Sequence, residues 1–299
     1  MTPEVGGDQP ENKCWAAQAQ TECLIKDRVY FLNIMVQTRT CQELQKDLRG
    51  CGASPLWLRP AASDNPSMAT PPPFLSIIVP VLNEGPRLQY QLQALAPWRS
   101  AGVEVLLVDG GSSDGSVQAV ACWVDRVLLA PRGRASQMNA GAAQALGELL
   151  LFLHADTCLP DDALPQLQAL TAGQASWGRF DVQIDSPRPL LRVVSCLMNQ
   201  RSRLSGVATG DQAIFVRRQV FEAVGGFPDI ALMEDIALSQ RLLRLARPAC
   251  LRLRVRTSAR RWEKHGVWRT IALMWCLRAA FFVGVHPDRL ARLYGYQPR

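Results

Sequence analysis

Short apolar runs that stop at polar residues recur along the middle of this chain. They cover residues 74–81, 103–108, 126–130 and 149–153. Runs of this length, rich in Val, Ile and Leu, are typical of strands buried in a parallel sheet. Helical patterns lie between them, at about 83–98, 116–122 and 133–146. Strands that alternate with helices predict right-handed βαβ units and a parallel sheet.

The pattern becomes more mixed beyond Pro160. Helices are predicted at about 160–172, 190–205, 218–224, 236–246 and 267–284, and short strands at 177–184, 213–216 and 251–257. The strand at 177–184 alternates apolar and polar residues and is expected to be antiparallel. The strand at 251–257 alternates apolar residues with Arg and has a basic face. We therefore expect an α/β fold with a mostly parallel sheet, followed by a C-terminal helical extension.

Polar residues follow each of the first four predicted strands. They include Glu84, Asp109, Arg134 and Asp156. In an open α/β sheet, ligands bind beyond the carboxyl ends of the strands. A carboxylate there, as at Asp156, is placed to hold a divalent metal against a phosphate; the alternative is an Asp that caps the next helix. The Gly/Ser-rich segment 109–116 is either a ligand loop or a plain turn. The chain contains neither the glycine fingerprint of a classical dinucleotide site nor a P-loop.

Three segments are expected along the chain. Residues 1–73 lack sustained periodicity and become rich in Pro, Ser and Ala, which predicts a poorly ordered N-terminal extension. A small helical partner-binding module is the alternative for this segment. The main folded domain is expected at 74–265, and an amphipathic helix and tail at 266–299.

Positive charge is concentrated near the C-terminus. Residues 241–299 contain 14 Arg or Lys and two acidic residues, whereas the whole chain carries +7. This favours an anionic partner, either a phosphate-bearing ligand or a membrane surface. No basic-plus-aromatic recognition motif is present, so nucleic acid is not expected. The nine cysteines form no C-x-x-C pair, which favours a reducing compartment and hence a cytoplasmic location. Peripheral membrane contact is a further expectation, because the C-terminal region is basic.

Several motifs together resemble the family 2 glycosyltransferases. They are P-V-L-N-E at 80–84, V-D-G-G-S-S-D-G-S at 108–116, H-A-D at 154–156 and M-E-D at 233–235. The resemblance implies the type A glycosyltransferase fold, a mostly parallel sheet in a Rossmann-like nucleotide-binding arrangement. The further motifs G-R-A-S-Q-M-N-A-G, G-D-Q-A-I-F-V-R-R, G-G-F-P, L-M-E-D and S-A-R-R-W resemble, more narrowly, the subgroup named arsenosugar biosynthesis glycosyltransferase, or radical-SAM/selenodomain-associated transferase 2.

The resemblance implies a binding site for a nucleotide-sugar donor, such as a UDP- or GDP-sugar. Its nucleoside contacts fall on Pro80, Val81, Glu84 and Asp109. Asp156 corresponds to the Asp that ligates Mg²⁺ or Mn²⁺ on the diphosphate, and the cation of Arg134 is suited to the same diphosphate. At the first position of that motif His154 replaces Asp, either as a contact to ribose or metal or as a structural residue.

The family's catalytic base corresponds to Asp235, with Glu234 orienting that base or the acceptor. The alternative for this pair is an acidic cap and first turn of the next helix. Arg261 and Trp262 match the R-W of Q-x-x-R-W, where Ser258 replaces Gln, and Arg260 adds charge suited to the diphosphate. Asp211 is expected to line the acceptor side of the site; the alternative is that it belongs to a plain turn. Residues 225–228 are expected to be a flexible segment at the start of the loop that carries Asp235.

The leading hypothesis is an inverting, metal-dependent glycosyltransferase that acts on an unknown acceptor hydroxyl. A nucleotidyltransferase of related fold is a second hypothesis, although it predicts a Gly-rich, Lys-containing signature after the first strand. A non-catalytic protein that binds a nucleotide sugar or a membrane is the third. The helix at 267–284 contains Arg269 and Arg278, which disfavours spanning a bilayer. An ordinary packed helix and a helix at a membrane surface remain open.

Overall fold

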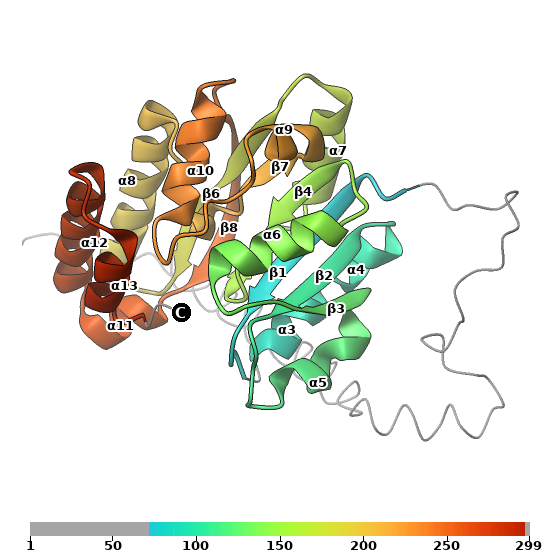
Figure 1. Ribbon diagram of the computed structural model, residues 1–299, viewed down its shortest axis with the longest axis horizontal. Coiled ribbons are helices and arrows are strands. Elements are labelled where there is room, and N and C mark those ends of the chain that lie inside the picture. Colours follow the sequence, from blue (N-terminus) through green and yellow to red (C-terminus); the bar gives the residue numbers. More distant parts are fainter. Residues whose placement is uncertain (1–71, 86, 297–299) are drawn as a thin grey trace, which may run out of the picture. The chain divides into compact units, whose positions relative to one another are not determined.

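A sheet of eight strands in the order β3-β2-β1-β4-β7-β6-β8-β5 forms the centre of the fold (Figure 1). The computed structural model describes residues 72–85 and 87–296. These residues belong to one unit, Ala69–Arg299. Apart from its last two residues, the predicted extension 1–73 lies outside the described residues.

The first half of the sheet is parallel, as the apolar runs predict. Its strands are β1 (Leu75–Val81), β2 (Glu104–Asp109), β3 (Arg126–Leu129) and β4 (Leu149–Phe152). Strand β1 pairs in parallel with both β2 and β4, and β2 pairs in parallel with β3. Every residue of β1, β2 and β4 is buried, because helices cover both faces of this part of the sheet.

The second half of the sheet is mixed. Its strands are β5 (Thr157–Cys158), β6 (Trp177–Asp185), β7 (Phe215–Arg217) and β8 (Ala249–Ser258). Strand β7 is antiparallel to β4 and β6, and β5 is antiparallel to β8. Strand β6, expected to be antiparallel, is antiparallel to β7 but parallel to β8 along most of its length. Three Arg side chains on β8 are exposed, which confirms its basic face.

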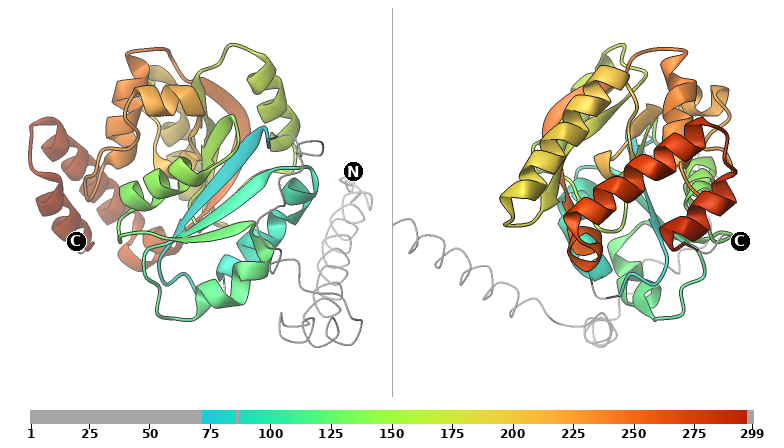
Figure 2. Two further views of the ribbon diagram at one scale, coloured as in Figure 1. Left: turned by 45° about the vertical axis from the view of Figure 1, so that its right-hand side comes forward. Right: turned by 90° about the vertical axis from the view of Figure 1, so that its left-hand side faces the viewer.

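Helices lie on both faces of the sheet (Figures 1 and 2). They are α3 (Arg87–Ala94), α4 (Ala96–Ser100), α5 (Ser116–Val120), α6 (Arg134–Gln144), α7 (Ala163–Ala172), α8 (Pro189–Ser205), α9 (Arg218–Ala223), α10 (Glu234–Leu243), α11 (Arg260–His265), α12 (Val267–Phe282) and α13 (Pro287–Tyr294), with 3₁₀ turns η2 (Ala121–Trp123) and η3 (Gly210–Gln212). The single helix predicted at 83–98 is two helices, because Pro97 has no N–H to continue the first. The pattern missed β5, α11 and α13, which are short.

The core has two layers because successive strand residues point to opposite faces of the sheet. Ile77 and Val79 of β1 belong to one apolar cluster, and Ile78 belongs to the other. The second cluster includes Phe152, Phe221 and Phe227, whose ring centroids lie 4.8 to 5.6 Å apart. Strand β4 and the segment leading to α10 are thereby packed together.

A buried ion pair lies within β6, and a partly exposed arginine joins it to α8. The fully buried Arg179 donates to Asp181 on the same strand, and Arg203 of α8 donates to the other carboxylate oxygen of Asp181 at 2.7 Å. Arg179 also donates to the backbone oxygen of Asn199 at 3.1 Å. Charges buried in this way need several partners, because their desolvation is unfavourable.

Candidate active site

Two buried glutamine side chains organise the carboxyl edge of the sheet. Gln137 of α6 donates to the backbone oxygens of Val81 and Val108, at 2.7 and 2.8 Å. Gln91 of α3 donates to the backbone oxygens of His154 and Thr157, at 2.7 and 2.8 Å. Each amide joins two segments at the edge of the sheet, and the oxygens of Val81 and His154 also accept from backbone N–H groups at 3.0 Å. The ends of β1, β2 and β4 are thus fixed relative to the helices that begin the site.

The turns that follow β1 and β2 are bonded to each other. The backbone N–H of Asn83 donates to Ser112 Oγ at 3.0 Å, and Ser113 N–H donates to Asn83 Oδ1 at 2.9 Å. Gly85 N–H donates to Asp114 at 3.0 Å. The side-chain and backbone hydrogen bonds from Ser116 lower the pKa of Asp114. The ionised Asp114 carboxylate therefore accepts the hydrogen bonds that hold this loop. These turns carry the residues expected to contact the nucleoside.

Asp109 and Glu84 already have partners within the protein. Asp109 ends β2 and accepts from the N–H and hydroxyl of Ser112, at 2.9 and 2.6 Å. Glu84 forms an ion pair of 3.2 Å with Arg260 of α11. Pro80 and Val81 are buried at the end of β1. The predicted nucleoside residues are therefore brought together, and Arg260 lies on their side.

His154 supports the turn that contains Gly210. A Cβ atom built at Gly210 would lie 2.2 and 2.3 Å from two imidazole atoms of His154, so only glycine fits above this ring. His154 Nδ1 is also 3.5 Å from Asp211 Oδ1. The ring is buried. Of the two alternatives for His154, this geometry favours a structural role, between β4 and η3.

Asp235 is held at the start of α10. One carboxylate oxygen accepts from Gly210 N–H at 2.8 Å, and the other accepts from Ile236 N–H at 2.7 Å. The residue at the helix cap is Met233, which has a left-handed φ of 70°. This conformation is strained for a residue with a Cβ, and such strained residues cluster at functional sites. Glu234 and Asp235 are first-turn acids but not the cap, so the capping alternative explains only part of their placement.

The two acids of α10 resist ionisation. Burial, followed by the neighbouring charge of Asp235, raises the pKa of Glu234 to about 7. Burial also raises the pKa of Asp235, although its two backbone hydrogen bonds oppose the shift. Acids with raised pKa values are common among the groups that transfer protons in active sites.

Arg134, at the first position of α6, faces the acidic residues of the site. Desolvation opposes its charge, but the charges of Glu234, Tyr294, Asp211 and Asp156 raise its pKa overall. For Asp211, desolvation is outweighed by the hydrogen bond and charge of His154 and by Arg134 and Arg261, so its pKa is lowered. The site therefore alternates cations and carboxylates. A cation among several acids can receive the negative charge of a diphosphate.

Two further residues at the site were missed by sequence reasoning. Tyr294 of α13 lies over Arg261, with the guanidinium carbon 3.5 Å from the ring centroid. Arg201 of α8 has two buried nitrogens, Nε and Nη2, without a hydrogen-bond partner, and it feels the charges of Asp235 and Asp211. No local motif marks either residue, because each reaches the site only through the packing of its helix, α8 or α13.

Trp262 does not join this group of charged residues. It packs, half-buried, on an apolar cluster that includes Leu191, Val194 and Val267, between α8 and α12. Of the predicted Arg261–Trp262 pair, Arg261 thus reaches the site electrostatically, and Trp262 anchors α11.

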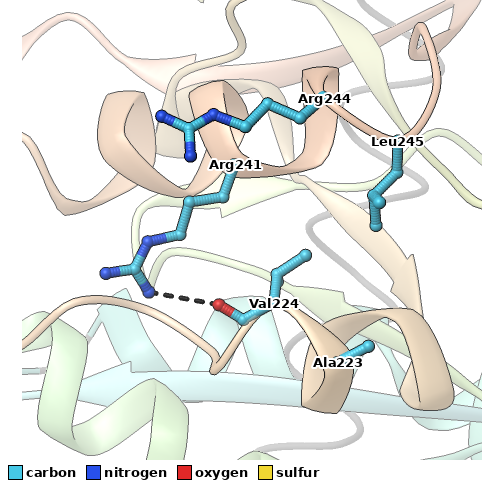
Figure 3. A pocket seen from close by; sticks show the side chains of 5 residues that line it. All are labelled: Ala223, Val224, Arg241, Arg244 and Leu245. Atoms are coloured by element: carbon cyan, nitrogen blue, oxygen red, sulfur yellow. Dashed lines mark hydrogen bonds between the residues drawn. The ribbon is translucent and has the colours of Figure 1, made fainter.

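A pocket beside α10 contains none of the predicted site residues (Figure 3). It is lined by Ala223, Val224, Arg241, Arg244 and Leu245.

The segment before α10 is held by hydrogen bonds from two helices. Arg241 donates to the backbone oxygens of Val224 and Gly226, at 3.2 and 3.3 Å. Asn139 of α6 bonds both backbone groups of Phe227, at 2.8 and 3.0 Å. The segment 225–228, expected to be flexible, is thus held at both α10 and α6.

The donor set suits a metal that is shared with a substrate. In the described ranges, 72–85 and 87–296, no group of three or more His, Cys, Asp or Glu side chains converges as a metal cage. Asp156 is half-buried at the carboxyl end of β4, with Arg134 close enough to act on it. Mg²⁺ commonly binds through one or two carboxylates, waters and substrate phosphates. The residues fit a metal in that mode, through Asp156.

Comparisons with known sequences agree with the motifs. Residues 76–224 match the family described as Glycosyl transferase family 2. An undecaprenyl-phosphate 4-deoxy-4-formamido-L-arabinose transferase of Klebsiella pneumoniae subsp. pneumoniae is 34% identical over 52% of this chain and 53% of its own length. A PGL/p-HBAD biosynthesis glycosyltransferase of Mycobacterium bovis is 28% identical over 52% of this chain and 63% of its own length. The match thus spans less than two thirds of either curated relative.

Comparisons with solved structures confirm the expected fold. Staphylococcus aureus TarS 1-349 in complex with UDP matches with a TM-score of 0.52 and 19% identity, over 62% of this chain and 60% of that chain. The mannosyltransferase PcManGT of Pyrobaculum calidifontis, in complex with GDP-Man and Mn²⁺, matches with a TM-score of 0.50 and 21% identity, over 71% and 62%. Residues 76–224 are therefore a Glycosyl transferase family 2 domain, and the described chain has the type A glycosyltransferase fold.

Proposed function

We propose that this protein is an inverting, metal-dependent glycosyltransferase that transfers a sugar from a nucleotide-sugar donor to an acceptor hydroxyl. The observation that carries the proposal is the placement of Asp235, which both Gly210 N–H and Ile236 N–H fix in one orientation. Its raised pKa favours accepting a proton. The negative charges of Glu234, Asp211 and Asp156 raise the pKa of Arg134, which marks the same site.

Each group has a distinct role in this proposal. Asp235 takes the proton of the acceptor hydroxyl as that oxygen attacks the anomeric carbon, and Glu234 orients it. Arg134 and Arg261 meet the charge that develops on the leaving diphosphate. Asp156 would hold Mg²⁺ or Mn²⁺, which supplies further positive charge to the diphosphate. Asp211 lines the acceptor side.

The donor is proposed to be a UDP- or GDP-sugar, bound through Pro80, Val81, Glu84 and Asp109. The complexes of TarS with UDP and of PcManGT with GDP-Man support this class of donor. We keep the arsenosugar subgroup and a cytoplasmic location with peripheral membrane contact within the proposal. Because one relative is named for undecaprenyl phosphate, lipid-linked acceptors are the first class to test.

The domain division is also part of the proposal. Residues 74–265 would form the catalytic domain, 1–73 an extension, and 266–299 a helix and tail. Tyr294, which lies over Arg261, supports a contribution of this last segment to the site.

Release of the nucleotide distinguishes the three functional hypotheses. The protein is incubated with UDP- and GDP-sugars, Mn²⁺ and candidate acceptors, and the products are separated. Free nucleoside diphosphate with a glycosylated product supports transfer. Pyrophosphate release from a sugar phosphate and a nucleoside triphosphate would indicate a nucleotidyltransferase. Donor binding without turnover, with every acceptor tried, would support the non-catalytic alternative.

Asp235→Asn removes the proposed base while retaining a side chain of the same size. We expect donor affinity to stay within about twofold and turnover to fall on the order of 10²–10⁴-fold. Calorimetric donor titration and the nucleotide-release assay measure the two effects. Asp229→Asn, on the preceding loop, is the control. Turnover near wild type in Asp235→Asn would place the base elsewhere.

Asp156→Ala tests the metal assignment. We expect Mn²⁺ to strengthen UDP binding to the wild-type protein and to have no such effect on the variant, because the carboxylate that would hold the metal is absent. UDP titrations with Mn²⁺ and with EDTA measure this, and circular dichroism checks the fold. Asp162→Ala, at the start of α7, is the control. A metal effect that persists in folded Asp156→Ala contradicts the assignment.

Glu234→Gln tests the raised pKa through stability. Between its ordinary value of 4.5 and about 7, the folded protein binds more protons at Glu234 than the unfolded chain does. Its contribution to the free energy of unfolding therefore falls as pH rises through that window, and is constant above it. Relative to Glu234→Gln, the wild type should lose on the order of 1–3 kcal/mol from pH 4.5 to 7.5. Thermal unfolding in EDTA measures the difference, and parallel curves would contradict the shift.

Gly210→Ala and His154→Ala test the support of Asp235. The new methyl group collides with the His154 ring and displaces the N–H that Asp235 accepts from. Gly210→Ala should therefore lower the melting temperature and turnover, and part of the loss should be recovered in the double variant, where the ring is absent. Such coupling between contacting residues is typically 0.5–3 kcal/mol. Strictly additive effects would show that the two residues do not constrain each other.

A further inference from the structure

Helix α12 carries a row of large apolar side chains on the outside of the protein. Trp268 is 73% exposed, Trp275 67% and Phe282 60%, and the adjoining Val283 is 80% exposed. The first three are spaced by seven residues, nearly two turns, so they lie on one face of the helix. Two exposed alanines, Ala272 and Ala279, lie between them on the same face. We call these five residues of α12 the aromatic stripe.

The two arginines of α12 flank this stripe. At about 100° per residue, Arg269 lies about 100° from Trp268 on one side and Arg278 about 80° on the other. The opposite face contains Thr270 and Leu277, which are both 2% exposed. The helix is therefore divided into an outer apolar stripe, two basic flanks and an inner face packed on the domain.

The inner face of α12 packs on two apolar clusters of the described domain. Leu277 packs in a cluster with Met233, Ile236 and Leu290. Met233 directly precedes the proposed catalytic acids, and Leu290 belongs to α13. At its other end, Val267 packs with residues of α8 and with Trp262. Helices α8 and α12 lie next to each other in the second view of Figure 2. The outward direction of the stripe is thus set by the core.

We propose that the aromatic stripe of α12 docks on an anionic lipid surface and lies in the plane of that surface. Trp and Phe are suited to the interfacial zone of a bilayer, where an amphipathic helix buries its apolar face. Arg269 and Arg278 lie where their stems can follow the apolar zone and their guanidinium groups can reach anionic headgroups. The excess of Arg and Lys among residues 241–299 provides longer-range attraction.

The charge and the length of α12 favour docking on a lipid surface over pairing with a second copy of the protein or crossing a bilayer. Helix α12 contains no acidic residue, so pairing two copies of the stripe would bring arginine flanks together without compensation. The helix has 16 residues, or about 24 Å at 1.5 Å per residue, which is shorter than a hydrocarbon core of about 30 Å. Within the described part of the chain, no helix is long and apolar enough to cross a membrane.

The inference specifies the membrane contact in the proposed function and does not depend on the reaction. Helix α13 follows α12 and places Tyr294 over Arg261 at the site. A lipid surface bound at α12 would therefore lie against the same C-terminal segment that contributes to the site.

Flotation of the full chain with vesicles tests the docking. Vesicles contain either phosphatidylcholine alone or equal parts of phosphatidylcholine and phosphatidylglycerol. We expect strong flotation with the anionic vesicles at 50 mM salt and a loss of at least fivefold at 500 mM salt. Trp268→Ser/Trp275→Ser should reduce binding at least tenfold, and Arg269→Gln/Arg278→Gln should reduce it only with anionic vesicles. Leu129→Ser/Leu146→Ser removes two exposed apolar residues elsewhere and should have no effect.

Three results would overturn the proposal. They are absent flotation with anionic vesicles, flotation that the tryptophan variant does not reduce, and retention of the protein in the membrane after carbonate extraction. Light scattering after gel filtration is run in parallel, and a dimer lost in the tryptophan variant would assign the stripe to a second copy instead. Trp275→Ser alone provides a milder variant, and circular dichroism verifies its fold. Nucleotide release with a soluble acceptor is measured separately, so a failure of the proposed reaction is distinguishable from a failure of docking.

Discussion

The site depends on the hydrogen-bond requirement of the carbonyl groups at the ends of three buried strands. A buried carbonyl without a donor is destabilising, and here the strand ladder stops while the chain is still enclosed. Gln137 and Gln91 each donate to two of these carbonyl oxygens through one amide group. Two of the four oxygens, on Val81 and His154, also accept from backbone N–H groups, so the amides complete and cross-link a partly paired edge. Because Gln137 lies one turn after Arg134 on the same helix, this bonding also sets where the cation of Arg134 stands. The requirement extends to Gly110, where a Cβ atom would lie 3.1 Å from the Gln137 amide. The order of the site therefore begins with backbone groups, and the charged side chains are placed on that frame.

The charged groups then constrain one another. Asp235 accepts from Gly210 N–H, and the ring of His154 lies directly beneath Gly210. A change in the loop after β4 is thus transmitted to the acid at the start of α10 through a single glycine. The replacement of the usual first Asp by His154 also removes one negative charge from the neighbourhood of Asp156. Arg134 compensates the acids that remain, which explains why carboxylates can gather here without mutual repulsion dominating.

Sequence reasoning succeeded where local pattern determines structure. The strands at 75–81, 104–109 and 149–152 are apolar runs closed by polar residues, and their parallel pairing places Asp109 and Asp156 at one edge. It failed where the arrangement depends on distant packing. The ion pair of Glu84 with Arg260 joins residues 176 positions apart, and Tyr294 reaches Arg261 from a helix that the pattern did not show. Trp262 matches a motif of the site, whereas its packing against apolar residues of α8 and α12 is not visible in the local pattern.

The ion pair within β6 has a consequence for how this sequence can vary among relatives. Arg179 and Asp181 form a buried pair, and Asp181 also accepts from Arg203, whose side chain is 33% exposed. Loss of a single partner from such a network leaves an uncompensated buried charge, which typically costs about 3–5 kcal/mol. Replacement of the whole group by apolar residues of similar volume avoids that loss. Arg179 and Asp181 should therefore covary across an alignment, with both charges retained or both exchanged, whereas Arg203, whose side chain reaches solvent, should vary more freely.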